Sequence, residues 1–100
     1  MVVGTSIIQL HLPGIKSLKE KRSVLKGLIN RLHKEFNIAC AEVEFHDVWQ
    51  SSGIGIAVIS TSTKHAKAVI DNVVNWIELN RPDLSVIDYS MEILHITGRY

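Results

Sequence analysis

The sequence predicts an α+β sandwich in which two helices cover one face of an antiparallel four-stranded sheet. Its apolar patterns follow the order strand, helix, strand, strand, helix, strand. The third predicted strand is apolar on both faces, as expected in the middle of a sheet. The second alternates apolar and polar residues, as expected at an edge. We therefore predict the spatial strand order 4-1-3-2.

The first half of the chain carries one predicted strand and one predicted helix. Residues 2–12 are rich in β-branched side chains and end at Pro13-Gly14, a turn signal. The helix is expected to begin at Ser17, where the spacing Ser17-x-x-Glu20 predicts a capping box. Its apolar residues lie on one stripe that should face the sheet: Leu18, Leu25, Leu28, Ile29, Leu32 and Phe36.

Residues 38–48 alternate in polarity. We expect one side to be apolar and the other to meet water, with the apolar side made of Ala39, Ala41, Val43 and Phe45, and the polar side of Glu42, Glu44 and His46. Residues 54–60 form the doubly apolar strand.

A second helix should begin at Ser62 or Thr63 and stop at Asn80-Arg81-Pro82, and residues 85–96 are the last predicted strand. Together these elements predict a ferredoxin-like βαββαβ sandwich, as a single domain over residues 1–100.

Composition indicates a cytoplasmic protein. Cys40 is the only cysteine, which excludes an intrachain disulfide and suits a reducing compartment. The uncharged stretches 1–15 and 48–63 are shorter than the roughly 18 apolar residues that a membrane span requires. The first twelve residues lack the basic segment of a secretory signal. We therefore expect no membrane contact.

Charge is distributed very unevenly. Seven of the eleven Lys and Arg residues lie between residues 16 and 34, where Glu20 is the single carboxylate. Several crowd the predicted helix N-terminus, where the macrodipole disfavours each exposed cation by about 0.3–1 kcal/mol. Because such a block is typical of an anion-binding surface, the candidate residues are Lys16, Lys19, Lys21, Arg22, Lys26, Arg31 and Lys34. The alternative is that these cations are solvated or paired with carboxylates such as Glu42, Glu44, Asp71 and Glu78.

The open face of the predicted sheet offers a second kind of surface. Neither predicted central strand carries an aromatic residue, which disfavours the base stacking used by RNA-recognition motifs. Ile7 and one face of the third strand should be exposed, because the helices cover only the other face. Such an apolar patch predicts a homodimer or a protein partner. Trp49, in a turn, either packs over the edge of the core or anchors a partner.

Catalytic and metal-binding patterns are missing from the sequence. The five histidines are scattered, without the spacing of a metal-binding helix, and no glycine-rich phosphate loop occurs. Cys40, a small residue in a strand, is typical of a core position. We therefore expect no catalytic residue, metal or cofactor, and a protein that is not an enzyme.

Five short stretches carry a resemblance to a known family: SLKEKR from Ser17 to Arg22, Leu25-Lys26, Phe36-Asn37, Ala41-Glu42-Val43 and Asp47-x-Trp49-Gln50. They resemble the YlxP-like family of small bacterial proteins, a domain of unknown function, over essentially the whole chain. The resemblance implies a ferredoxin-like fold. It also implies association with translation initiation and ribosome-maturation factors, and it supplies no catalytic residues.

Two hypotheses about function follow. The first is a non-enzymatic module that docks on structured RNA, ribosomal RNA above all, or on a ribosome-associated partner, through phosphate contacts of the basic helix. The second is a protein-interaction or homodimerisation domain that uses Ile7 on the open sheet face and the Trp49 turn.

Overall fold

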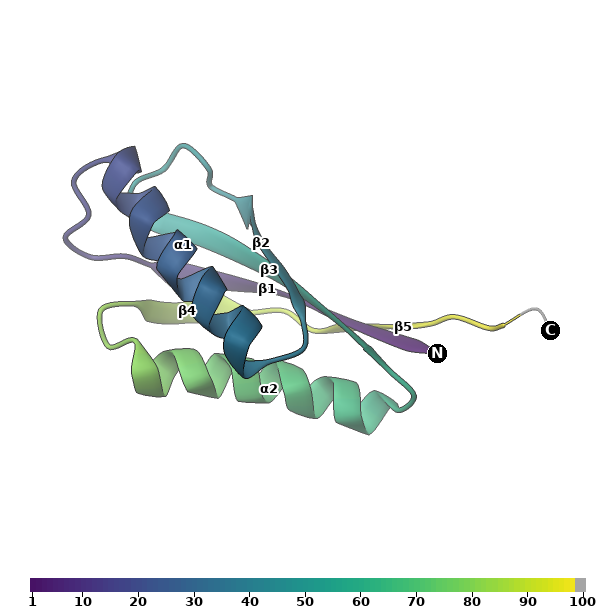
Figure 1. Ribbon diagram of the computed structural model, residues 1–100. Helices are drawn as coiled ribbons and strands as arrows, with labels where there is room; N and C mark the ends of the chain where they lie inside the picture. The colour runs from purple at the N-terminus through teal and green to yellow at the C-terminus, as the bar shows by residue number, and fades with distance from the viewer. Residues whose placement is uncertain (99–100) are drawn as a thin grey trace.

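The computed structural model describes residues 1–98, and it confirms the α+β sandwich (Figure 1). The elements in chain order are β1 (Val2–His11), α1 (Leu18–Glu35), β2 (Ala39–Glu44), β3 (Ser51–Ser60), α2 (Thr63–Asn80), β4 (Ser85–Tyr89) and β5 (Glu92–His95). The sheet order is β2-β3-β1-β4, which is the predicted order. Both helices lie on the same face of the sheet (Figure 1).

The central strand β1 organises the sheet. It pairs antiparallel with β3 along its whole length, and its other edge is shared by β4 and β5. The single last strand predicted over residues 85–96 is therefore two strands. Between them Ser90 bonds β1 through both its side chain and its backbone: its Oγ accepts from the amide of Ile7 at 2.9 Å, and its carbonyl accepts from the hydroxyl of Ser6 at 2.5 Å.

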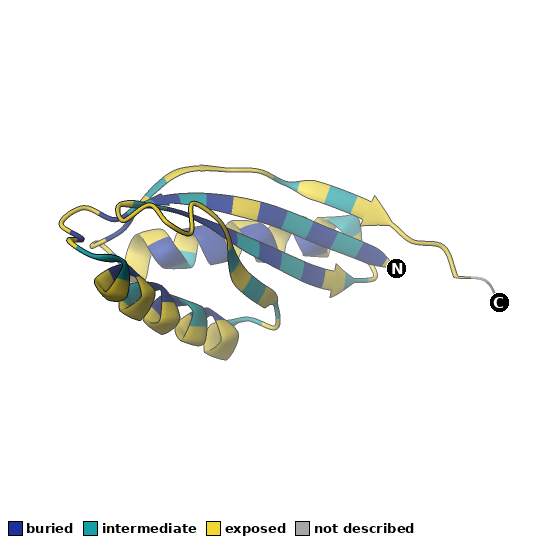
Figure 2. Ribbon diagram, turned by 90° about the horizontal axis from the view of Figure 1, so that it is seen from above, coloured by how far each residue is buried: buried dark blue, intermediate teal, exposed yellow. Residues whose placement is uncertain are grey.

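The core fills the space between the sheet and the two helices. Alternate residues of β1 and β3 point into it, and Figure 2 shows this alternation of burial along the strands. A Cβ on Gly4 would lie only 3.1 Å from the Cβ of Ala66, so glycine at this position lets α2 approach β1 closely. The fully buried apolar residues include Ile8, Leu10, Leu28, Leu32, Ile54, Ile70, Val73 and Ile77.

Lys21 of α1 lies in this core, with only 1% of its surface exposed. Its Nζ donates to the carbonyls of Phe45 at 2.5 Å and Val48 at 2.6 Å, and it lies 2.9 Å from Oε2 of Glu42. An ammonium group has three protons, so these three acceptors satisfy it completely. The prediction that Lys21 contacts an external anion is therefore wrong, because its charge is already neutralised inside the protein.

Strand β2 differs from the prediction in where it ends and in which side chains it turns toward the helices, and the contact with Lys21 explains the second difference. The strand ends at Glu44 because Phe45 adopts a left-handed conformation, with φ at 62°. From Ala39 to Val43 its two faces are the reverse of those expected, and a register shift between Glu42 and Glu44 places Glu44 on the side away from the helices as well. Glu42 is turned toward the helices, where it meets Lys21 and accepts a hydrogen bond from Ser52 at 2.7 Å.

The other side of β2 is the open side of the sheet. Ala39, Ala41 and Val43 are all exposed there. A carboxylate is required on the inner side to neutralise the buried ammonium, and this requirement outweighs the burial of three small apolar side chains.

The Lys21→Met substitution should destabilise the protein strongly. It keeps the aliphatic stem but leaves two carbonyl groups without their donor and Glu42 without its counter-charge, so we expect a loss of about 3 kcal/mol or more in the free energy of unfolding. Urea denaturation measures the change. The matched control is Lys19→Met on the exposed side of α1, which should stay within about 0.5 kcal/mol of wild type. Equal stability of the two variants would contradict the structural role of Lys21.

Cys40 should make stability depend on alkaline pH. It pairs with Ile56 on the core side of β2, and burial raises the pKa of its thiol from 9.0 to about 11. The unfolded chain ionises this thiol first, so stability should fall as pH rises from about 9 to about 11. By urea denaturation, wild type should lose roughly 1 kcal/mol more stability than Cys40→Ala between pH 8 and about 10.5, because a thiol that is only partly buried realises only part of the full effect. Parallel pH profiles for the two proteins would contradict this.

Candidate functional site

Four exposed cations in and just before the first half of α1 make up what we call the basic flank: Lys16, in the segment that leads into the helix, and Lys19, Arg22 and Lys26 of the helix itself. Lys19, Arg22 and Lys26 are spaced by three and four residues, so they share one side of the helix over about 10 Å. All four are exposed and lie toward the N-terminal end of α1. Four of the seven predicted anion-binding residues are thus exposed between residues 16 and 26, and three of them share one side of α1.

The remaining predicted cations lie apart from the basic flank. Lys34 is exposed in the last turn of α1. The guanidinium of Arg31 lies 3.5 Å from the carboxylate of Glu35 and 5.4 Å from the ring centre of Trp76. Arg31 is therefore already engaged within the protein. Lys21, the seventh, is buried. Its position three residues after Leu18 and four before Leu25, inside the apolar stripe, was the sequence signal for its burial.

Carboxylates do not neutralise the basic flank. Among residues 1–98 the ion pairs are Lys21–Glu42, Arg31–Glu35 and Arg81–Asp83. None of them involves a cation of the basic flank. The alternative of pairing with a carboxylate therefore holds for Lys21, whose partner is Glu42, whereas the four cations of the basic flank have no such pair with Glu44, Asp71 or Glu78.

The N-terminus of α1 is occupied by its own cap. The hydroxyl of Ser17 accepts from the amide of Glu20 at 3.1 Å, and Oε2 of Glu20 accepts from the amide of Lys16 at 3.2 Å. The predicted capping box is present, although its carboxylate reaches the residue before the cap. Since a carboxylate already lies at the positive end of the helix, an external anion would be bound by side chains.

A groove runs beside the basic flank, between α1 and the edge strand β2. Its volume is about 290 Å³, and its lining residues are Arg22, Leu25, Lys26, Ile29, Asn30 and Glu42. The charge of Glu42 is compensated by Lys21 at 2.9 Å. The groove therefore has two uncompensated cations on its helical wall.

The loop between β2 and β3 exposes aromatic surface next to the start of α1. Trp49 is 50% exposed and Phe45 is 39% exposed. Half of the surface of Trp49 therefore meets solvent, so this residue is not buried over the core edge, and its role as an anchor for a partner stays a prediction. Sequence reasoning missed Phe45 as a surface residue because it was assigned to the apolar side of a strand.

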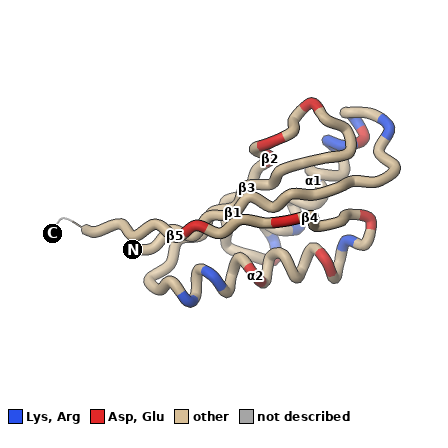
Figure 3. Tube along the Cα trace, turned by 180° about the vertical axis from the view of Figure 1, so that it is seen from behind, with Lys and Arg blue, Asp and Glu red and all other residues tan. Residues whose placement is uncertain are grey.

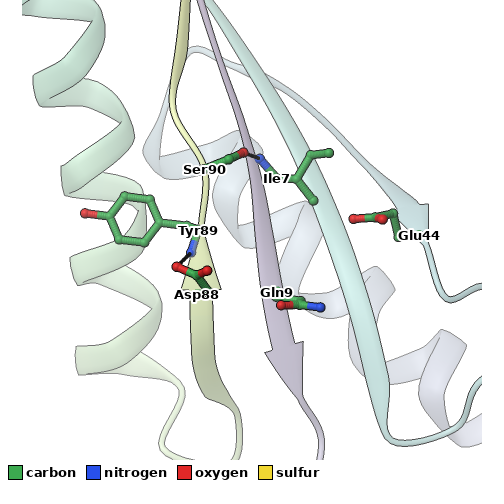
Figure 4. A pocket seen from close by; sticks show the side chains of 6 residues that line it. All are labelled: Ile7, Gln9, Glu44, Asp88, Tyr89 and Ser90. Carbon is green, nitrogen blue, oxygen red and sulfur yellow. Dashed lines mark hydrogen bonds between the residues drawn. The ribbon is translucent and has the colours of Figure 1, made fainter.

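The open sheet face carries apolar side chains and carboxylates, in contrast to the cations of the basic flank. Ile7 is exposed as predicted, and it borders a shallow depression of about 510 Å³ with Ala41, Val43 and Ala57. A second depression of about 220 Å³ adjoins it and includes Glu44 and Asp88 (Figure 4). The five strands contain four carboxylates and no Lys or Arg, and Figure 3 shows red without blue along them.

Tyr89 borders the same depression, but its ring turns toward α2 (Figure 4). Its hydroxyl donates to Asp71 at 3.0 Å, and this hydrogen bond to a carboxylate raises the pKa of the phenol. Tyr89 therefore ties β4 to α2 and is not directed at a ligand.

Within residues 1–98, no three His, Cys, Asp or Glu side chains gather as metal ligands. Cys40, with its pKa near 11, is a protonated thiol at neutral pH and not an activated nucleophile. In the same part of the chain, no helix is both long enough and apolar enough to cross a membrane.

Comparisons with known proteins agree with the fold and the predicted resemblance. "Uncharacterized protein YlxP" of Bacillus subtilis (strain 168) is 37% identical over 62 residues, which are 62% of this chain and 67% of that protein. A de novo designed protein with a ferredoxin fold, solved by NMR, matches 100% of this chain and 90% of its own, with a TM-score of 0.51 at 14% identity, which shows the ferredoxin-like fold. The family model described as "Protein of unknown function (DUF503)" matches residues 3–91. Because this match spans most of the chain, the protein belongs to the DUF503 family of proteins of unknown function.

Proposed function

We propose that this protein is a non-enzymatic module that binds structured RNA, ribosomal RNA above all, through the basic flank of α1. One observation carries the proposal: the four cations of the basic flank are exposed, and none has a carboxylate partner among residues 1–98. Cations at the N-terminal end of a helix oppose its macrodipole. A local arrangement that lowers stability in this way is typical of a functional surface.

Phosphate groups would supply the missing counter-charges. Arg22 offers a planar guanidinium that can hold a phosphate through two parallel hydrogen bonds, whereas Lys19 and Lys26 act as point charges. Contacts of this kind orient the protein on RNA but read little sequence. Each neutralised phosphate releases condensed counterions, so affinity should depend steeply on salt.

The salt dependence gives the first test. If three cations of the basic flank each neutralise one phosphate, the affinity for ribosomal RNA should fall roughly 20- to 40-fold between about 50 and 200 mM salt. The double variant Arg22→Glu/Lys26→Glu should bind at least about tenfold more weakly than wild type at low salt. Filter binding measures both effects.

The matched control is Lys64→Glu/Lys67→Glu, which makes the same change of charge on the exposed side of α2. It should keep most of the affinity. The proposal fails if wild type does not bind at low salt, or if the two double variants lose affinity equally.

The open sheet face supports a second candidate function, the docking of a protein partner. Its apolar floor and the carboxylates at its rim, Glu44, Asp88 and Glu92, complement an amphipathic helix that carries Lys or Arg beside an apolar stripe. A second copy of this chain is less suitable as the occupant. Two such faces would bring their apolar floors together but would also oppose carboxylates to carboxylates at the rim, with no cation between them.

Ile7→Lys should weaken this docking, because it inserts a charge into the apolar floor. Isothermal titration with a synthetic amphipathic helix of leucine and lysine should show binding to wild type and much less to this variant. Leu79→Lys, which changes an 82% exposed residue on α2, should behave like wild type. The same peptide with glutamate in place of lysine should not bind. Sedimentation that shows a dimer dissociated by Ile7→Lys would favour self-association instead and overturn this candidate.

A further inference from the structure

We infer that the RNA bound by this protein presents unpaired nucleotides, whose bases stack on Trp49 and Phe45 beside the basic flank. The inference rests on the proposed RNA-binding function and names the class of its ligand. It assigns the β2–β3 loop, and not the sheet, as the surface that contacts bases.

The two aromatic rings are available to a ligand. Half of the surface of Trp49 and 39% of that of Phe45 are exposed. Trp76 differs, because it packs against the core and lies beneath the guanidinium of Arg31. Exposed aromatic surface of this size, close to cations, is what single-stranded nucleic acids require for stacking.

The loop that carries these rings is held in place from inside. Nζ of Lys21 donates to the carbonyls of Phe45 and Val48, and the amide of Val48 donates to the carbonyl of Phe45 at 3.1 Å. The backbone of Phe45 and that of Val48, which directly precedes Trp49, are thus tied to α1. A preformed platform of this kind loses little conformational entropy when a base stacks on it.

The same contacts hold the backbone of the loop that carries the rings against the start of α1, where the basic flank begins. Lys21, which holds the loop, directly precedes Arg22 of the basic flank. On the other side of Trp49, Nε2 of Gln50 donates to the carbonyl of Ile15 at 3.4 Å, and Ile15 directly precedes Lys16. Figure 1 shows the β2–β3 loop beside the start of α1.

Charge then orients the ligand. Asp47 lies in the loop, between Phe45 and Trp49, and disfavours phosphate there. Phosphates should therefore follow the basic flank, and bases should turn toward the loop. Paired bases in a duplex present no free face to an aromatic ring, so this surface should prefer unpaired segments such as loops, bulges and ends.

The preference for unpaired over duplex RNA can be measured in the Trp76→Phe variant of the whole chain, in which Trp49 is the remaining tryptophan. The probes are a single-stranded oligoadenylate and an RNA duplex of equal length, both at low salt. We expect tighter binding of the single strand, together with quenching of Trp49 fluorescence that the duplex does not produce. Trp49→Ala should weaken single-strand binding roughly 5- to 150-fold, as measured by anisotropy, and leave duplex binding unchanged.

Two controls separate this inference from the proposed function. Arg22→Glu/Lys26→Glu should weaken the binding of both probes. Tyr89→Ala, which removes a partly exposed aromatic ring at the opposite edge of the sheet from β2, should change neither affinity. If both probes bind equally and Trp49→Ala changes neither, the stacking inference is wrong while the RNA-binding function stands. If Trp49→Ala weakens both probes alike, stacking is also excluded. If neither probe nor ribosomal RNA binds, the proposed function itself is wrong.

Discussion

A single buried ammonium group connects three parts of this protein. Lys21 extends from α1 into the core and ends on Glu42 of β2 and on two carbonyls of the β2–β3 loop. Removing one partner from such a cluster is expensive, whereas the complete cluster contributes little net stability compared with apolar packing. The main effect of the cluster is therefore to position the elements that it joins. It determines which face β2 presents to the helices and where the loop with Trp49 lies.

The surfaces that remain exposed divide the molecule by charge. The basic flank lies on the helical side, and the open sheet face has carboxylates and apolar side chains. A whole-chain charge of +1 conceals this division. Because the two surfaces lie on different sides of the sheet, RNA on α1 would leave the sheet face accessible to a protein. The Lys21 cluster belongs to neither surface, yet it positions the aromatic loop beside the first.

The order of elements and the sheet order were both predictable, because the first follows from local periodicity and the second from whether a strand is apolar on one face or two. The orientation of β2 was not. Alternation divides its residues into two sets, but it does not say which set faces inward. Ala39, Ala41 and Val43 are the more apolar set, yet they face outward because Lys21 requires Glu42 inside.

By itself, the sequence determined the fold class, the capped basic helix and the exposure of Ile7, since each follows from the spacing of neighbouring residues. Only the tertiary structure decided which of the seven clustered cations remain available to a ligand. Burial of a charge depends on acceptors that are distant in sequence, and the carbonyls that hold Lys21 are 24 and 27 residues away. The same distant contacts decided that the loop carrying Phe45 and Trp49 lies beside the start of α1, which no local pattern in the chain could reveal.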